Sequence, residues 1–118
     1  MSRRTERVSE EIRAEIARVL RQDATDPRLR LVTLTRVDVA PDLTRADVFW
    51  SVIESKGAAP REATERALEH AAGFVRSRLA EALPLRRAPT LHFHYDPSLA
   101  LGSETLGLLR QLRREDED

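Results

Sequence analysis

The sequence of 118 residues contains no cysteine, which excludes a disulfide scaffold, a thiol enzyme and a zinc site with cysteine ligands. Aromatic residues make up only 4%, so the core must be built from aliphatic side chains. No apolar run approaches the roughly 20 residues that a membrane span needs. The first residues also lack the apolar segment of a signal peptide. We therefore expect a soluble cytoplasmic protein without membrane contact.

Lysine is nearly absent, and 19 of the 20 basic residues are arginine. The planar guanidinium of arginine can bind phosphate with two hydrogen bonds at once. The net charge is zero, but the last four residues, 115–118, are all acidic. Residues 1–114 therefore carry 20 basic and 16 acidic residues, a net charge of +4. The length is that of one domain. We expect a single domain over residues 1–114 and a disordered acidic tail over 115–118.

The first half of the chain predicts a helix followed by a strand hairpin. An apolar stripe with helical period predicts a helix over residues 4–22. Asp26-Pro27-Arg28 predicts a turn. Residues 31–39 are rich in β-branched side chains and predict a strand, whose apolar parity changes midway and indicates a bulge. A second strand over 46–53 follows after so short a connection that the two strands should form an antiparallel hairpin.

The second half predicts a long helix, a third strand and a short last helix. Apolar residues keep the helical period from residue 61 to residue 82, and we assign Phe74 and Val75 to the same core stripe. Gly73 lies in the middle and indicates a kink, in a conformation that alanine would fit poorly. Alternation predicts a strand over 90–95, and an apolar stripe predicts a helix over 103–114. Helices on one face of a small mixed sheet give an α+β sandwich of two layers.

The small residues Ala71-Ala72-Gly73 are the main candidate binding motif. Without large side chains, a nucleic-acid backbone could approach the peptide groups closely. A break of the helix here would also expose free N–H groups that favour phosphate. Four arginines follow before the end of the third strand: Arg76, Arg78, Arg86 and Arg87. The alternative is a small-residue contact where this helix crosses the first one. An RRM is excluded, because it would begin with a strand and need an aromatic RNP pattern.

The sequence resembles the ribosome-binding factor A family. Any one matching block is short, but their shared order and spacing extend over about residues 3–110. The matching blocks are Arg7-Val8, Asp26-Pro27-Arg28, Val32-Thr33-Leu34-Thr35-Arg36-Val37, Asp42-Leu43, Ala46-Asp47-Val48, Ala71-Ala72-Gly73-Phe74-Val75-Arg76, Leu85-Arg86-Arg87-Ala88-Pro89-Thr90-Leu91, Phe93, Asp96 and Ser98. Family members often end in a longer basic tail, whereas this chain ends in four acids.

The resemblance implies a fold similar to a type II KH domain, in the order α-β-β-α-kink-α-β plus a short C-terminal helix. In that family an Ala-x-Gly helix–kink–helix replaces the usual GXXG loop, so the RNA-facing role carries over to Ala71 and Gly73. Nearby arginines carry over more loosely as RNA-binding residues: Arg76, Arg78, Arg86, Arg87, Arg3, Arg4 and Arg28.

The resemblance also implies a function in ribosome biogenesis. Its members bind the free immature 30S small subunit near the ends of the 16S rRNA and assist late maturation and processing of this rRNA, a role associated with cold adaptation. We therefore expect a monomeric RNA-binding protein without catalysis and without a cofactor, and an assembly GTPase as a further partner. KH-like domains clamp a few single-stranded nucleotides through backbone contacts, which fits this role.

Two rival functions come from other classes. His92, His94 and Asp96 alternate along the third strand and so share one face, a spacing that could hold zinc in a small hydrolytic enzyme. A protein-interaction module is the other rival, and it would need an exposed apolar stripe, whereas the stripes here are accounted for by one core. No Ser–His–Asp arrangement and no glycine-rich phosphate loop occurs in the sequence.

Overall fold

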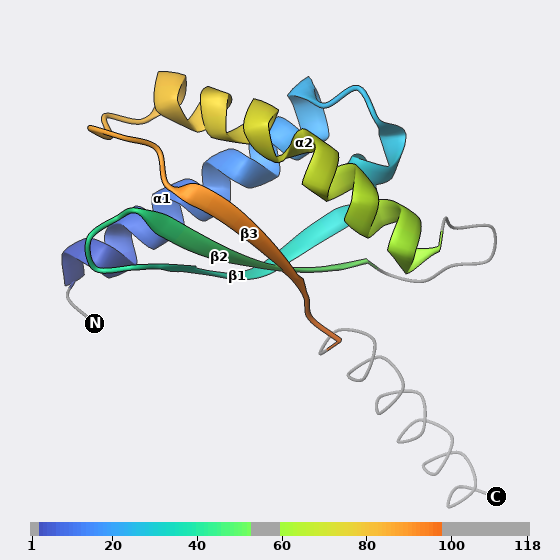
Figure 1. The fold of residues 1–118 in the computed structure, drawn as a ribbon, viewed down its shortest axis with the longest axis horizontal. Coiled ribbons are helices and arrows are strands. Elements are labelled where there is room, and N and C mark those ends of the chain that lie inside the picture. The colour runs from blue at the N-terminus through green and yellow to red at the C-terminus, as the bar shows by residue number, and fades with distance from the viewer. Residues whose placement is uncertain (1–2, 53–59, 98–118) are drawn as a thin grey trace, which may run out of the picture.

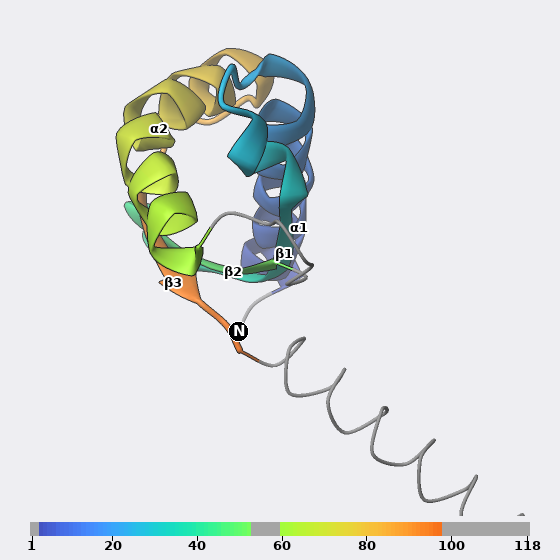
Figure 2. The ribbon, with the colours of Figure 1, turned by 90° about the vertical axis from the view of Figure 1, so that its right-hand side faces the viewer.

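The fold is a three-stranded sheet with two long helices, seen in a computed structural model that describes residues 3–52 and 60–97. Strands β1 and β2 are antiparallel, β2 and β3 are parallel, and the order in the sheet is β1-β2-β3. Both helices lie on one side of the sheet (Figures 1 and 2), which confirms the α+β sandwich of two layers. The elements are α1 (Arg3–Arg18), the π-helical turn η1 (Val19–Asp23), the 3-10 helix η2 (Pro27–Leu31), β1 (Val32–Val39), β2 (Arg45–Val52), α2 (Arg61–Ala82) and β3 (Thr90–Tyr95).

Helix α1 confirms the first predicted helix and continues directly into η1. Ile12 and Ile16 are fully buried against the sheet. In η1 the turn widens, and the Ala24 N–H donates to the Val19 carbonyl oxygen 2.9 Å away, five residues back. Val19 and Leu20, at the start of this turn, are both buried in the core.

The predicted turn at Asp26 opens the 3-10 helix η2. The Asp26 carboxylate accepts a hydrogen bond from the Arg28 backbone N–H at 3.0 Å and so caps the helix. Pro27 occupies the first helical turn, where its missing N–H leaves no carbonyl unpaired. Leu31 still belongs to η2 and is 64% exposed, so the strand that we expected to begin there begins at Val32.

The predicted bulge lies in β1. The pairing of β1 with β2 shifts between Leu34 and Arg36, which leaves Thr35 as the extra residue. The Thr35 hydroxyl lies 2.6 Å from Asp96 Oδ2, just beyond β3, and 3.3 Å from the carbonyl oxygen of Phe49 on β2. The extra residue therefore ties the three strands together.

Helix α2 has the predicted bounds, Arg61–Ala82, but it is not broken at Gly73. Its axis changes direction along its length (Figures 1 and 2), so the expected kink is present only as a bend. Ala71 and Ala72 before the glycine are the strongest helix formers, and the backbone φ of Gly73 is not in the positive region. The predicted break, with a second set of free N–H groups, is therefore wrong.

Strand β3 occupies the predicted residues and pairs with β2 so that Phe93 lies beside Val48. The largest fully buried side chain, Trp50, fills the space between sheet and helices and makes an edge-on contact with Tyr95, 5.2 Å between ring centroids. The helix expected over 103–114 and the tail over 115–118 lie outside the described residues. Within the described ranges, neither helix combines the length and the apolar character that crossing a bilayer requires.

Candidate nucleic-acid interface

The surface of α2 is open at Gly73. Ala71 is half-buried and Gly73 is exposed. A Cβ atom added to Gly73 would meet no atom within 4 Å, so the backbone here can be approached from solvent. Because α2 continues through this point, its free N–H groups lie only at its start near Arg61. The motif therefore offers close approach but no helix N-terminus for phosphate.

Arg76 follows this motif, and its guanidinium is already engaged by the protein. Its Nε and Nη2 atoms donate to the carbonyl oxygen of Ala88, at 3.1 and 3.0 Å. Ala88 lies in the connection between α2 and β3. Arg76 thus holds this connection against the helix, a structural role that the sequence did not indicate.

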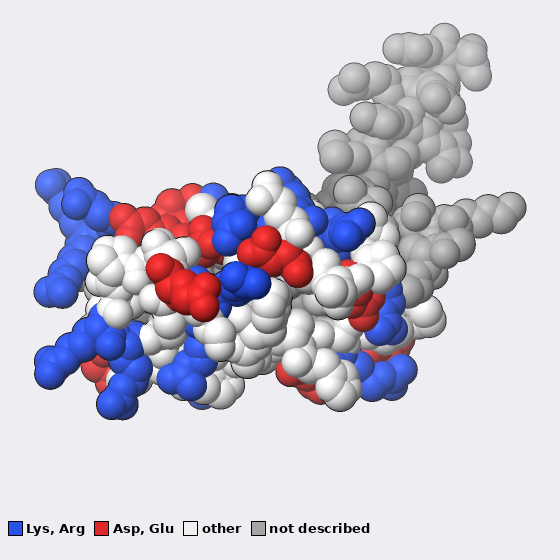
Figure 3. Space-filling model, turned by 90° about the horizontal axis from the view of Figure 1, so that it is seen from above, with Lys and Arg blue, Asp and Glu red and all other residues white. Residues whose placement is uncertain are grey.

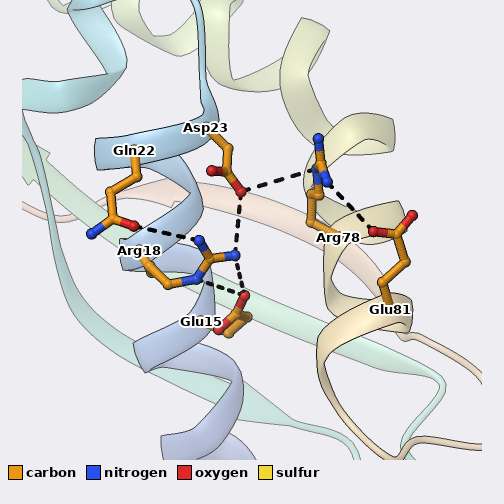
Figure 4. Close-up of polar contacts among 6 residues, drawn as sticks. All are labelled: Glu15, Arg18, Gln22, Asp23, Arg78 and Glu81. Atoms are coloured by element: carbon orange, nitrogen blue, oxygen red, sulfur yellow. Dashed lines mark hydrogen bonds and ion pairs between the residues drawn. The ribbon is translucent and has the colours of Figure 1, made fainter.

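Arg78 joins α2 to η1 in a network of charged side chains (Figure 4). Its Nε lies 4.0 Å from Asp23 Oδ2 and its Nη1 lies 3.5 Å from Glu81 Oε2. The same Asp23 oxygen accepts from Arg18 Nη2 at 3.2 Å. Arg78 also covers the ring of Phe74, with 5.1 Å between the guanidinium carbon and the ring centroid. Exposed pairs of this kind contribute little stability, so the network chiefly orients Arg78.

Arg28 is paired as well, with the carboxylate that caps η2. Its Nη2 lies 2.7 Å from Asp26 Oδ2, and its Nε lies 3.0 Å from Asp26 Oδ1. The Arg28 side chain, and then its backbone N–H, hold the pKa of the Asp26 carboxyl below its usual value. Arg28 and Arg78 are therefore charges with partners rather than free cations.

The remaining predicted arginines are exposed and, within residues 3–52 and 60–97, have no ion pair: Arg3, Arg4, Arg86 and Arg87. The start of α1 and the connection from α2 to β3, which carry them, lie at the same end of the molecule, on the left in Figure 1. Figure 3 shows basic side chains extending from that end. We call these four residues the arginine end. Exposed unpaired arginines are free to bind phosphate oxygens.

A groove of about 630 Å³ lies beside the Ala71 surface, between α2 and residues 23–29. The wall on α2 consists of Ala67, His70, Ala71, Phe74 and Arg78. We call it the α2 groove. It contains Ala71, Arg28 and Arg78 from the predicted site, and it adds residues that the sequence analysis did not select.

Phe74 is the clearest of these additions, and its assignment to the core is wrong. It is 39% exposed, while its neighbour Val75 is fully buried with Leu68 and Leu79. Successive helical residues point about 100° apart, so Phe74 lies at the edge of the apolar face whose centre Val75 occupies. The spacing of seven and four residues from Leu68 to Val75 to Leu79 was the signal that separates them.

The rival metal site is not assembled in the described part of the chain. His94 Nε2 lies 2.7 Å from Asp47 Oδ1, and its ring stacks on Phe49 at 5.1 Å between centroids. Asp96 instead meets the Thr35 hydroxyl. No three His, Asp or Glu side chains in residues 3–52 and 60–97 lie close enough together to hold a metal ion. These groups form polar contacts across the sheet.

Comparison with known proteins identifies relatives along nearly the whole chain. A sequence profile of the family described as ribosome-binding factor A matches residues 4–109. The ribosome-binding factor A of Pseudomonas syringae pv. syringae is 39% identical over 113 residues, which cover 96% of this chain and 82% of that protein. The protein of the same name from Pseudomonas aeruginosa is 37% identical over 113 residues, which cover 96% of this chain and 88% of that protein.

Solved structures agree with this match. The crystal structure of ribosome-binding factor A from Thermus thermophilus superposes with a TM-score of 0.67 at 25% identity, over 77% of this chain and 93% of that one. A homology model of the Thermus thermophilus protein was fitted into the cryo-EM map of a 30S–RbfA complex. It matches with a TM-score of 0.60 at 26% identity, over 75% of this chain and 91% of that one. The likeness confirms the predicted KH-like fold. The chain belongs to the ribosome-binding factor A family.

Proposed function

We propose that this chain binds the free immature 30S small ribosomal subunit and assists the late maturation and processing of its 16S rRNA. Membership of the ribosome-binding factor A family, along residues 4–109, carries this proposal. The relative from Thermus thermophilus that was fitted into the map of a 30S–RbfA complex supports the same partner. We expect the chain to act in the cytoplasm as a monomer, with an assembly GTPase as a further partner.

The arginine end supplies the phosphate contacts in this proposal. Arg86 and Arg87 extend from the short connection that Arg76 fixes to α2, and Arg3 and Arg4 extend from the start of α1. Contacts to phosphate position an RNA-binding protein without reading sequence. The open surface at Gly73 then allows an RNA backbone to approach α2 closely.

We further propose that the chain assists maturation by binding alone, without catalysing a step. A factor that holds rRNA in one conformation changes the balance between conformations through its differential affinity, and it needs no nucleophile. The His94–Asp47 contact lies on the strands, and we assign it a structural role in orienting the two side chains.

Co-sedimentation tests the proposed function. The protein is mixed with purified 30S subunits, 50S subunits and 70S ribosomes, and each mixture is separated on a sucrose gradient. We expect the protein to travel with 30S subunits and to bind more strongly to subunits that contain precursor 16S rRNA. In the mixture with 50S subunits we expect it to stay at the top of the gradient, unbound. A protein that stays at the top of every gradient would refute the proposal.

A further inference from the structure

The α2 groove contains an aromatic side chain that the fold leaves exposed. Among the described residues only Leu31 and Phe74 are large hydrophobic side chains with substantial exposure. A single exposed apolar residue is ordinary on a protein surface. Phe74, however, lines a concave groove, whose volume of about 630 Å³ lies in the usual range for small-ligand sites.

The small neighbours of Phe74 leave space beside its ring. Ala67 and Ala71 lie seven and three residues before Phe74 on the same flank of α2, and both line the groove. Because both residues are alanine, their methyl groups leave open the part of the groove beside the Phe74 ring that a larger side chain would fill. Arg78 covers part of the Phe74 ring, and the part that it leaves exposed is where a planar group can lie along the helix.

The charges inside the groove are already paired, which disfavours phosphate as the occupant. Arg28 is bound to Asp26 at 2.7 Å, and Arg78 lies between Asp23 and Glu81. These pairs leave the interior without a free cation for phosphate. An uncharged planar group with polar edges suits such an interior better, because it can stack on the ring and meet paired polar groups at the rim.

Free cations lie on the segments that wall the groove. Arg21 belongs to η1 and Arg30 belongs to η2, and both side chains are exposed. Neither has an ion pair with another residue in the described ranges. Neutral walls inside and cations on the flanking segments match the charge pattern of single-stranded RNA, in which neutral bases alternate with phosphates.

We propose that the α2 groove binds one unpaired nucleobase of single-stranded RNA, stacked on Phe74, while the neighbouring phosphates contact Arg21 and Arg30. Aromatic side chains and arginine planes are the usual stacking partners of splayed bases. The inference rests on the proposed function, since rRNA is the nucleic acid that this chain would meet. It adds Phe74 as a residue that contacts a base, where the arginine end contacts only phosphate.

A fluorescent oligonucleotide tests the inference. The probe is a nonamer of uridine with 2-aminopurine at its centre, whose emission falls when the base stacks on an aromatic ring. Phe74→Leu keeps an apolar side chain but removes the aromatic ring. Phe74→Tyr is a separate variant that keeps an aromatic ring at this position. Leu31→Ala removes the other exposed apolar side chain and is the matched control.

We expect the wild-type protein, Phe74→Tyr and Leu31→Ala to bind the probe and quench it. Phe74→Leu should bind about tenfold more weakly and quench little, in line with the usual contribution of one stacked base. Because Phe74 is exposed, its variants should keep the wild-type melting temperature. If Phe74→Leu did not fold, Arg21→Gln with Arg30→Gln would test the same site, and we expect it to weaken probe binding and flatten its salt dependence.

Three results would overturn the inference. The first is wild-type binding and quenching by Phe74→Leu, and the second is a wild-type protein that does not bind the probe. The third is a dimer seen by analytical ultracentrifugation that Phe74→Leu abolishes, because the groove would then serve a second copy of the chain. Co-sedimentation of wild-type protein with 30S subunits is measured in parallel, so that a failed inference is distinguished from a failed proposed function.

Discussion

The Arg76 guanidinium on α2 donates two hydrogen bonds to the carbonyl oxygen of Ala88, at 3.1 and 3.0 Å. Ala88 itself is buried, and it precedes β3 by two residues. One charged side chain therefore closes the connection from α2 to β3. Arg86 and Arg87 lie in this connection, so their positions depend on a neighbour that looks, in the sequence, like another RNA-binding arginine.

Arg76→Gln should lower the stability of the domain. The variant loses two charge-assisted hydrogen bonds to a buried residue, and we expect a loss of about 1–2 kcal/mol in the free energy of unfolding. Arg86→Gln is the matched control, because Arg86 is exposed without a partner among the described residues, and its stability should change by less than about 0.5 kcal/mol. Urea denaturation measures both. Equal midpoints for the two variants would contradict a structural role for Arg76.

Local patterns in the sequence predicted the elements well, because each depends on neighbours a few residues apart. The change of apolar parity within 31–39 predicted the bulge at Thr35, which the pairing register confirms. The alternation over 90–95 predicted β3 with its observed bounds. The end of η2 was missed at Leu31, since a 3-10 turn and a strand start have similar local composition there.

The candidate site was harder to predict, because its arrangement depends on residues far apart in the chain. Arg76 and Ala88 are twelve residues apart, and Arg78 meets Asp23 from a different helix. The sequence does not distinguish an arginine that is ion-paired in the fold from one that is free. The α2 groove combines α2 with residues 23–29, and no spacing within either segment indicates that they form one surface.

Gly73→Ala should stabilise the domain, contrary to the expectation from sequence alone. Gly73 lies within a continuous helix, its φ is not positive, and a Cβ atom would meet nothing within 4 Å. Alanine should then gain about 0.5–1 kcal/mol through its higher helix propensity. Thermal melts test this directly. An unchanged or lower melting temperature would mean that the bend in α2 needs glycine.

Gly73→Gln separates the helix from the interface. Glutamine is also a good helix former, so this variant should be at least as stable as wild type. Its longer side chain would cover the open backbone at Gly73 and should weaken binding to 30S subunits several-fold. Gly73→Ala, with its small methyl group, is the control and should bind nearly as well as wild type. Wild-type binding by Gly73→Gln would place the RNA elsewhere.

Arg86→Gln with Arg87→Gln should weaken RNA binding and reduce its salt dependence. Each lost phosphate contact lowers the slope of log affinity against log salt by roughly 0.7–0.9. Arg36→Gln is the control, because Arg36 is exposed on β1 but its charge is paired with Asp38 at 3.0 Å and covers the ring of Phe49. Binding to 30S subunits across a salt series gives both slopes. A double variant with the slope of Arg36→Gln would exclude the arginine end from the interface.

The acid stability of the domain should depend on Asp47. Hydrogen bonds from Arg45, and then from His94, hold the pKa of the Asp47 carboxyl below its usual value. A carboxyl whose pKa is lower in the folded state contributes stability above its unfolded pKa of about 3.9, and this contribution is lost as the pH falls through the folded pKa. Asp47→Asn should therefore melt below wild type at neutral pH, with a smaller difference near pH 3 (roughly one unit below that unfolded value).

Glu69→Gln is the control for this measurement. Glu69 is an exposed carboxyl on α2 that has no ion pair in the described ranges, so its removal should leave the fall in melting temperature with pH unchanged. Asp26→Asn offers an independent check, because Arg28 lowers the pKa of Asp26 in the same way. If Asp47→Asn ran parallel to wild type while Asp26→Asn did not, the contacts of Asp47 with Arg45 and His94 would contribute no stability to the folded state.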